Sequence, residues 1–231
     1  MAAGLTALHA TFVPGSTLWC RNISRGTNAG NRVALTFDDG PSPGCTEAVL
    51  DVLKREGVPA AFFVIGRNVQ QNPALLRRVH SAGHLIGNHT FDHDHFSVFY
   101  GYKYWIDQLQ RTDEVIAKAI GERPRLFRPP MGFKSVFTAA AARRLDYRIV
   151  TWSRRGKDGI ATSAENILAR LAQQTVPGDI VTLHDGLDPH CSRTPEMTVK
   201  ALPSLIASLR QRGIEFARLD ELIGTDAYFK S

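Results

Sequence analysis

Two adjacent carboxylates, Asp38 and Asp39, stand in the segment TFDDGP at residues 36–41. An apolar run precedes them and Gly-Pro follows, a pattern typical of a buried strand that ends at this point. Two neighbouring carboxylates resist ionising together unless a positive charge holds them. A metal ion or an arginine is the usual remedy, so the pair indicates an active site. An Asp-Gly-Pro turn is the alternative, but it explains one carboxylate better than two.

Two histidines, His89 and His93, lie four residues apart in the segment GNHTFDH at residues 87–93. On a helical turn this spacing puts both imidazoles on one face, where they can reach one ion. A carboxylate from Asp39 or Asp38 would complete the ligand set and leave positions for water and substrate. Adjacent residues of an extended chain point in opposite directions, so the other aspartate can face the reacting water. The alternative is a polar, histidine-rich loop, because His95 lies just beyond.

Three further polar residues follow predicted strands. Arg128 precedes two prolines, which force a rigid, extended exit and suit an arginine that pairs with a carboxylate. His184 ends a buried strand, and the pKa of histidine lies near working pH, so it is a candidate general acid or base. Asp158 lies beyond the strand expected at residues 148–152. Taken singly, Arg128 could be a surface residue and His184 a core histidine with a satisfied hydrogen bond.

Strands and helices alternate from residue 32 onward, which predicts an α/β fold with a parallel sheet covered by helices. A closed or nearly closed barrel and a doubly wound open sheet both fit, although no glycine-rich phosphate loop follows the first strand. We expect Thr46 and Asp220 to cap helices, and Pro203 to kink or split one. The polar residues all lie beyond the carboxyl ends of strands, and in an α/β barrel these ends form the catalytic face. Strands are expected at 32–37, 60–65, 85–87, 126–127, 148–152, 179–183 and 214–219, and helices at 45–56, around 75–79, and at 104–120, 137–145, 163–171 and 195–213.

The 231 residues fit one domain. We expect a lead-in segment at residues 1–30, the domain at 31–224 and a tail at 225–231. A net charge of +6 favours an anionic partner, although the basic pairs are scattered in the way that solvated surface charge is. The chain has no basic-aromatic stripe typical of a nucleic-acid binder and no apolar run of membrane-spanning length. We expect a monomer.

The cysteines Cys20, Cys45 and Cys191 are odd in number and widely spaced, without the CxxC pair of a zinc-cysteine site. A Cys45–Cys191 disulfide stays open, while free thiols would favour a reducing compartment. The first ten residues lack the basic start and unbroken apolar core of a secretory signal. The expected location is therefore the cytoplasm, or the cell envelope if an export or anchor segment lies outside this sequence.

Four motifs together resemble the polysaccharide deacetylase family, which is carbohydrate esterase family 4 with its NodB-homology domain. They are TFDDGP at 36–41, HTFDH at 89–93, RPP at 128–130 and Leu-His at 183–184, and the resemblance covers roughly residues 32–222. It implies a single-domain, distorted (β/α) barrel of seven or eight strands. It also implies a metal-dependent hydrolase that uses a metal-activated water to remove N-acetyl groups from amino sugars of peptidoglycan or a chitin-like oligosaccharide.

The resemblance assigns a role to each motif residue. Asp39, His89 and His93 resemble the metal ligands, usually of zinc, with other divalent transition metals as alternatives. Asp38 resembles the general base, and Arg128 resembles the partner that keeps it ionised.

The remaining roles concern the leaving group and the substrate. His184 resembles the general acid that protonates the leaving amine, and Leu183 resembles the residue that lines the acetyl-methyl pocket. The backbone N–H of Met131 stands where the family has an oxyanion donor. We expect Pro130 and Trp152 to contact the substrate as well.

The sequence departs from the family pattern in two places. Met131 replaces a frequent aromatic residue, and the frequent Asp-x-x-Asp-Trp motif becomes Arg155-Gly-Lys157-Asp158-Gly159. We expect Asp158 to orient His184. The basic, open wall suggests an anionic substrate, such as a peptidoglycan strand or a phosphorylated glycolipid.

Two other functions remain. One is a deformylase or deacetylase of a lipid-linked amino sugar. The other is an inactive carbohydrate-binding barrel, which would be marked by loss of the base, a metal ligand or the acid, and none of these is lost.

Overall fold

The computed structural model of the protein describes residues 2–27, 29–160, 162–186, 188 and 195–230. Within these ranges, one sheet holds all the named strands, and each paired neighbour runs parallel. Its order is β1-β6-β5-β4-β3-β2-β8-β7, with β9 beside β2. The strands are β1 (Asn22–Ile23), β2 (Arg32–Asp38), β3 (Ala60–Val64), β4 (Leu85–Asn88), β5 (Leu126–Phe127), β6 (Arg148–Val150), β7 (Arg154–Arg155), β8 (Ile180–His184) and β9 (Glu215–Phe216).

The sheet curls into a distorted barrel, and one short stretch of chain brings its two ends together. β6 pairs with β1 and β5, and β7, which follows almost at once, pairs with β8. Between them, the Ser153 backbone N–H donates to the Ile180 carbonyl at 3.1 Å. The predicted α/β barrel is confirmed, and the doubly wound open sheet is wrong because the chain crosses this seam.

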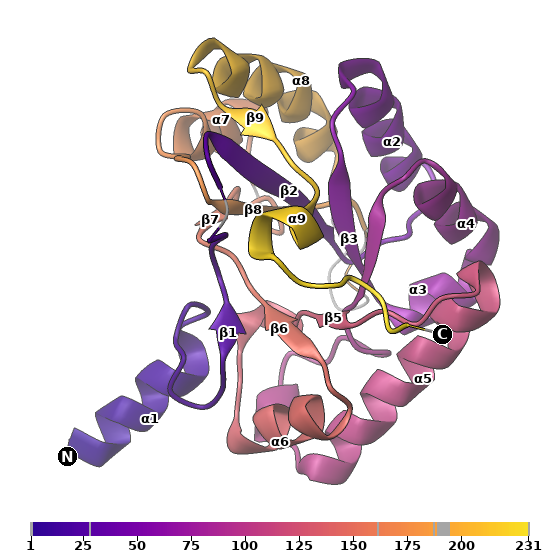
Figure 1. Cartoon of the computed structure of the whole chain (residues 1–231), viewed down its shortest axis with the longest axis vertical. Helices are drawn as coiled ribbons and strands as arrows, with labels where there is room; N and C mark the ends of the chain where they lie inside the picture. Colours follow the sequence, from indigo (N-terminus) through magenta and orange to yellow (C-terminus); the bar gives the residue numbers. More distant parts are fainter. Residues whose placement is uncertain (1, 28, 161, 187, 189–194, 231) are drawn as a thin grey trace.

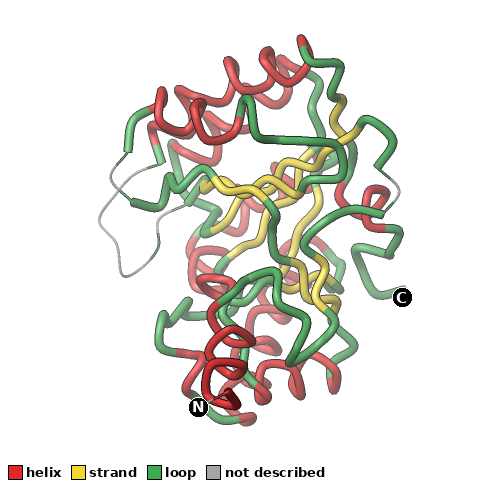
Figure 2. Tube along the Cα trace, turned by 90° about the vertical axis from the view of Figure 1, so that its left-hand side faces the viewer, coloured by secondary structure: helices red, strands yellow, loops and turns green. Residues whose placement is uncertain are grey.

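Helices surround the curled sheet (Figure 1), while the strands run through the interior (Figure 2). α9 lies across the centre of the ring in the view of Figure 1. The helices are α1 (Ala2–Phe12), α2 (Cys45–Glu56), α3 (Gly66–Gln71), α4 (Pro73–Ser81), α5 (Tyr102–Ile120), α6 (Val136–Arg144), α7 (Ala164–Leu171), α8 (Glu196–Gln211) and α9 (Leu219–Ile223), with 3-10 turns η1 (Ser97–Phe99) and η2 (Pro130–Gly132).

The central strands are apolar on both faces because each face meets a different layer. In β2, Val33, Leu35 and Phe37 belong to the main core beneath the helices, whereas Ala34 joins a second cluster that includes Leu222 of α9. β3 and β8 alternate between the same two clusters. Burial of both faces is typical of parallel sheets, and it explains the continuous apolar runs in the sequence.

Several predicted helix details are wrong. Gly44, not Thr46, precedes α2 as its N-cap, and the Thr46 hydroxyl instead binds the Asp185 carboxylate at 2.6 Å. Pro203 lies inside α8 without splitting it. Arg218 precedes α9, so Asp220 lies in its first turn. The short helix α3 was not predicted, because six residues show too little periodicity to detect.

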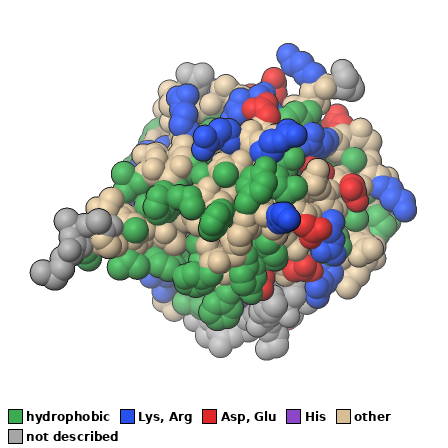
Figure 3. Space-filling view, turned by 90° about the horizontal axis from the view of Figure 1, so that it is seen from below, with side chains coloured by type: hydrophobic (Ala, Val, Ile, Leu, Met, Phe, Trp, Pro, Cys, Tyr) green, Lys and Arg blue, Asp and Glu red, His purple; other side chains and the backbone are tan. Residues whose placement is uncertain are grey.

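The first 30 residues contribute a helix and a strand. β1 extends the sheet beside β6, and the Lys134 ammonium donates to the carbonyls of Val13 (3.3 Å) and Pro14 (2.7 Å). The domain boundaries stay a prediction. Apolar side chains gather on the face seen from below (Figure 3), and α1 carries exposed Leu5 and Leu8.

No described helix combines the length and the apolar composition needed to cross a membrane. Cys20 and Cys45 are free cysteines, and Cys191, the other residue of the disulfide considered above, lies outside the described residues.

Candidate active site

The interior face of the barrel changes from apolar to polar towards the carboxyl ends of the strands. Along β2 this face carries Ala34, Thr36 and then Asp38, and along β8 it ends with Thr182 and His184. The two strands pair in register, with Thr36 opposite Thr182 and Asp38 opposite His184. Because side chains alternate along a strand, polar residues two apart gather at the same mouth of the barrel.

Asp38 is bound by a fully buried arginine. Arg128 Nη1 donates to Asp38 Oδ1 at 2.6 Å and to the Thr36 hydroxyl at 2.9 Å. Its Nε and Nη2 donate to the carbonyls of Val150 and Thr151, which hold the guanidinium in this orientation. Burial raises the pKa of Asp38, and the charge of Arg128 works against this rise without cancelling it.

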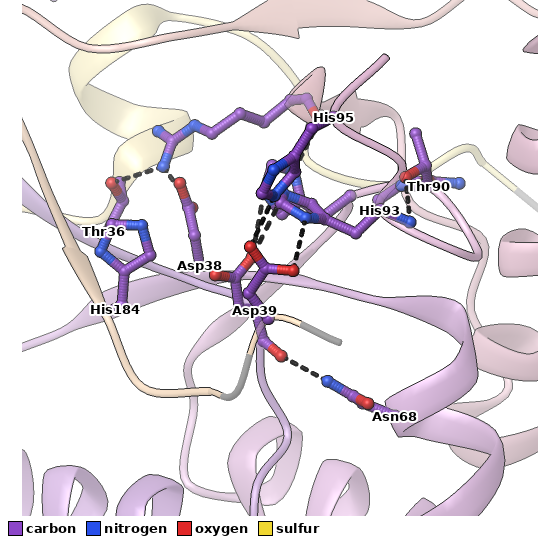
Figure 4. Close-up of polar contacts among 12 residues, drawn as sticks. Thr36, Asp38, Asp39, Asn68, Thr90, His93, His95 and His184 are labelled. Atoms are coloured by element: carbon purple, nitrogen blue, oxygen red, sulfur yellow. Dashed lines mark hydrogen bonds and ion pairs between the residues drawn. The ribbon is translucent and has the colours of Figure 1, made fainter. Parts of the chain in front are cut away.

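Asp39 turns away from Asp38 towards two histidines (Figure 4). Its Oδ1 lies 3.5 Å from His89 Nε2 and 3.4 Å from His93 Nε2, and all three residues are buried. The prediction that the two carboxylates face different ways is right, but its reason is wrong. β2 ends at Asp38, and Asp39 has a left-handed φ of 75°. The side chain of Asn68 holds this bend by donating to the Asp39 carbonyl at 2.7 Å.

The two histidines share a site without sharing a helical turn. Residues 89–93 form an irregular loop after β4, in which Thr90 and His93 have φ values of 67° and 52°. The imidazole centroids of His89 and His93 lie 4.8 Å apart. The prediction that both rings reach one point is confirmed, although left-handed residues rather than helical periodicity bring them together.

Four observations fit this cluster to a divalent cation. Asp39 Oδ1 is buried and has no hydrogen-bond partner among the described residues. His89 Nδ1 donates to the Arg128 carbonyl at 2.6 Å, which leaves the Nε2 lone pair facing Asp39. Burial and the neighbouring His93 hold the pKa of His89 well below its ordinary value, so this ring is neutral. Tetrahedral zinc ligands lie about 3.4 Å from one another, close to the spacings in the cluster.

His184 forms an ion pair with Asp158. His184 Nδ1 lies 3.0 Å from Asp158 Oδ1, while Asp158 Oδ2 accepts from the His184 backbone N–H and the Thr198 hydroxyl. Burial opposes the imidazolium, but Asp158, with Asp39 and Asp38 behind it, raises the pKa of His184 to about 10. The histidine is therefore a proton donor at neutral pH, and the predicted contact with Asp158 is present.

One cavity of about 520 Å³ contains these groups. Met131 and Trp152, which are predicted to contact the substrate, line it. Leu183 and Pro130 are corrections, because neither is among the residues that line the cavity, and Leu183 belongs to the main core. Strand alternation is the reason: Thr182, two residues before His184, faces the cavity in place of Leu183.

Sequence reasoning missed several residues that support the site. Thr36 and Thr198 hold Arg128 and Asp158, and Asn68 holds the Asp39 bend. Asp188 lies 3.5 Å from His93 Nδ1. Alternation along β2 could have shown that Thr36 faces the same side as Asp38. No local pattern indicates the other three, because their contacts join distant segments.

The comparisons with known proteins agree with this geometry. The polysaccharide deacetylase family model matches residues 25–150. A peptidoglycan-N-acetylglucosamine deacetylase of Bacillus cereus is 36% identical over 197 residues, which cover 83% of this chain and 87% of that protein. A chitooligosaccharide deacetylase of Bradyrhizobium sp. is 36% identical over 225 residues, which cover 91% and 98%.

A solved structure supports the same assignment. The crystal structure of a peptidoglycan N-acetylglucosamine deacetylase matches with a TM-score of 0.82 at 30% identity, covering 89% of this chain and 94% of the other. Because the family model spans more than half of the 231 residues and both relatives match over most of their length, this chain belongs to the polysaccharide deacetylase family.

Proposed function

We propose that the protein is a zinc-dependent hydrolase that removes N-acetyl groups from amino sugars of peptidoglycan or a chitin-like oligosaccharide. One observation carries the proposal: the buried cluster of Asp39, His89 and His93 opens into the same cavity as Asp38 and His184. A cation site, a carboxylate paired with arginine and a histidine paired with carboxylate are the groups that hydrolysis of an amide requires. The two relatives, named for N-acetylglucosamine and chitooligosaccharide substrates, support the substrate class.

Asp38 is the proposed general base. It accepts a proton as water attacks the amide carbonyl. Arg128 keeps the carboxylate in place through its contact of 2.6 Å, and burial raises the pKa of Asp38. A base becomes a better proton acceptor as its pKa approaches the working pH, provided that it stays ionised. Arg128 therefore positions the base and limits the rise of its pKa.

His184 is the proposed general acid. An amine is expelled from an amide only when its nitrogen is protonated, so the C–N bond breaks as His184 gives its proton to that nitrogen. The products are acetate and the free amino sugar. Asp158 keeps the donor charged by raising its pKa to about 10.

The negative charge that develops on the carbonyl oxygen needs donors. When bound, zinc supplies a Lewis acid for this oxygen and lowers the pKa of water. We assign the second donor to the backbone N–H of Met131, which lies in η2 with a left-handed φ of 56°. The exposed Met131 side chain lines the cavity, where it can contact the sugar.

We further propose that the glycan carries negative charge close to the reacting sugar. Arg155 and Lys157 line the cavity and are exposed, and neither forms an ion pair with any described residue. The adjacent Arg154, by contrast, is paired with Asp179 at 3.0 Å. Two unpaired cations on one wall favour an anionic group such as the carboxylates of a peptidoglycan strand.

A substitution matched for charge tests this preference. Arg155→Gln should raise KM for peptidoglycan at low salt and leave KM for neutral N-acetylglucosamine oligomers unchanged. Arg77→Gln removes the same charge from the exposed face of α4 and should change neither of these two KM values. Neutral oligomers turned over by the wild type as fast as peptidoglycan at low salt would contradict the proposal.

The experiment for the function itself measures acetate release from N-acetylglucosamine oligomers and peptidoglycan, with and without zinc. Release that depends on zinc and is lost in Asp38→Asn is the expected result. Zinc binding without acetate release would favour another acyl group or a lipid-linked amino sugar. An inactive carbohydrate-binding barrel would give no release from any substrate, but it has no need for the charged pairs that this cavity keeps. We propose a monomer, which sedimentation would test.

A further inference from the structure

His93 faces a different carboxylate with each ring nitrogen. Nε2 lies 3.4 Å from Asp39 Oδ1, and Nδ1 lies 3.5 Å from Asp188 Oδ1. The His93 side chain is only 4% exposed, and its Nδ1 makes no hydrogen bond within the described residues. When Nε2 holds a cation, the ring proton sits on Nδ1. A buried N–H requires an acceptor, so the nearby oxygen of Asp188 has a defined task.

Asp188 is itself held in place from the other side. Its Oδ2 lies 2.6 Å from His95 Nε2, on the loop that follows β4. The ring centroids of His93 and His95 lie 5.3 Å apart, and Figure 4 shows His95 beside His93. The Asp188 side chain is 14% exposed. The carboxylate thus connects the chain after β8 with the loop that carries two of the proposed metal ligands.

The two ligand histidines differ in this respect. His89 Nδ1 donates to the neutral carbonyl of Arg128 at 2.6 Å, so its orientation is fixed by the backbone. Among the described residues His93 has no comparable backbone acceptor, and the carboxylate of Asp188 faces it instead. A carboxylate behind a ligand imidazole raises the basicity of the coordinating nitrogen, and so strengthens its bond to the metal.

We propose that Asp188 is a positioning residue for the metal site: it accepts a hydrogen bond from His93 Nδ1, fixes the tautomer and tightens zinc binding. The inference rests on the proposed zinc site. Outer partners of this kind typically change metal affinity by about 10- to 100-fold. Asp188 would act through His93 and would not touch the zinc.

A second cation held by His93, His95 and Asp188 is the competing interpretation, because these three also offer ligand atoms close together. Neutral imidazole has one lone pair and one N–H. If Nε2 of His93 binds the first cation, Nδ1 can bind a second only after losing its proton. An acceptor role for Asp188 needs no such step, and we therefore favour it.

The experiment measures zinc affinity by competition with a chromophoric chelator on the full-length apoprotein. Asp188→Ala should weaken zinc binding by about 10- to 100-fold, with one equivalent bound as in the wild type. Asp188→Asn should lose less, because an amide oxygen still accepts the hydrogen bond without the charge. Asp51→Ala, which removes an exposed carboxylate from α2, should leave the affinity unchanged.

Two further readouts separate positioning from loss of structure. The unfolding midpoint of the Asp188→Asn apoprotein should equal that of the wild type, and the visible spectrum of its cobalt form should keep the wild-type ligand set. Affinity of Asp188→Ala within twofold of the wild type would overturn the inference. So would a second zinc equivalent that disappears in both Asp188→Ala and His95→Ala.

The inference and the proposed function can fail separately. Zinc binding weakened in Asp188→Ala, in a protein that releases no acetate from any N-acetylated glycan, would support the positioning role and overturn the function. Acetate release by the wild type, together with unaltered zinc affinity in Asp188→Ala, would support the proposed function and overturn the positioning role. A wild-type protein that binds no zinc would overturn both.

Discussion

At the scale of single residues, the proposed proton acceptor, Asp38, and the proposed proton donor, His184, each contact a residue of opposite charge that changes their pKa values. Arg128 opposes the burial that raises the pKa of Asp38, while Asp158 raises the pKa of His184 to about 10. At neutral pH the imidazole is therefore protonated, while Arg128 favours the ionised form of the Asp38 carboxylate. Titratable pairs with such opposed states are typical of acid–base catalysis.

Asp158→Asn should move the alkaline limb of the kcat profile to lower pH. The substitution removes the carboxylate that raises the pKa of His184, so this pKa should fall towards the ordinary histidine value of about 6.5. A proton donor is lost as pH rises through its pKa, so activity should disappear at lower pH than in the wild type. Thr198→Val removes only a neutral hydrogen bond to the same carboxylate and should shift the limb less. An alkaline limb unmoved by Asp158→Asn would mean that another group supplies the proton.

At the scale of elements, the site depends on how tightly the chain segments after β2 and β8 pack together. A Cβ added at Gly186 would lie 2.0 Å from the Asp39 carbonyl carbon and 2.2 Å from the Gly40 nitrogen. Both contacts are with backbone, which cannot move without moving the Asp39 carboxylate. The absence of a side chain at this position therefore sets the distance between the metal cluster and the acid.

Gly186→Ala should lower zinc affinity and kcat together, because the displaced Asp39 no longer meets the two histidines. Overpacking of this kind also costs about 1–3 kcal/mol of the free energy of unfolding. Gly101→Ala is the matched control, since a Cβ there meets nothing within 4 Å. Zinc titration and denaturant unfolding of both variants check the prediction, which is wrong if Gly186→Ala binds zinc like the wild type.

Lys134→Met should loosen the lead-in segment from η2. The buried ammonium donates to the carbonyls of Val13, Pro14 and Gly132, and its removal takes a charged donor from each and leaves the Gly132 carbonyl without a donor among the described residues. The expected loss is about 1–3 kcal/mol of unfolding free energy. Lys118→Met, on the exposed face of α5, should lose little.

The same lysine gives a second readout. Burial lowers the pKa of Lys134 to about 8, below its unfolded value of about 10.4. Between these two pKa values, Lys134 binds a proton more readily in the unfolded chain than in the folded protein. The free energy of unfolding of the wild type therefore rises as the pH rises from about 8 to about 10.4, and this contribution is lost as the pH falls through about 8. Lys134→Met should lack this contribution in denaturant unfolding measured across the window. Identical pH dependence in the two proteins would contradict the prediction.

At the scale of the whole molecule, apolar side chains close one end of the barrel, and the polar residues of the candidate active site lie at the other end. α9 contributes Leu219, Leu222 and Ile223 to the interior cluster, while the polar groups gather where the strands finish. The three proposed metal ligands come from two loops, after β2 and after β4. A cation bound there would hold together segments that are far apart in the unfolded chain.

Removal of metal with a chelator should lower the Tm, and zinc should restore it. Zinc at about 100 times its Kd stabilises the folded state by about 2.7 kcal/mol, because the unfolded chain lacks the assembled site. Asp39→Asn should lose most of this zinc-dependent rise, whereas Asp38→Asn should keep it. Thermal unfolding at several zinc concentrations checks this, and equal Tm values with and without zinc in the wild type would rule it out.

Much of the fold and of the site could be predicted because the relevant patterns are local. Apolar runs fixed the positions of β2, β3 and β8, and β5 lies where it was predicted. The residue types at positions 38, 39, 89, 93, 128 and 184 indicated a metal-assisted hydrolysis before any contact was known. The error at Leu183 was also local, since strand alternation already puts Thr182 on the face of His184.

The sequence by itself determined the chemistry and the order of the elements, because residue type and hydrophobic periodicity are properties of the chain. The tertiary structure alone decided which groups meet. The left-handed bend at Asp39, the loop of His93 and the approach of Asp188 join segments up to 95 residues apart, from His93 to Asp188. No short-range pattern encodes such contacts, because they arise only when the parallel strands close the barrel and bring their carboxyl ends to one mouth.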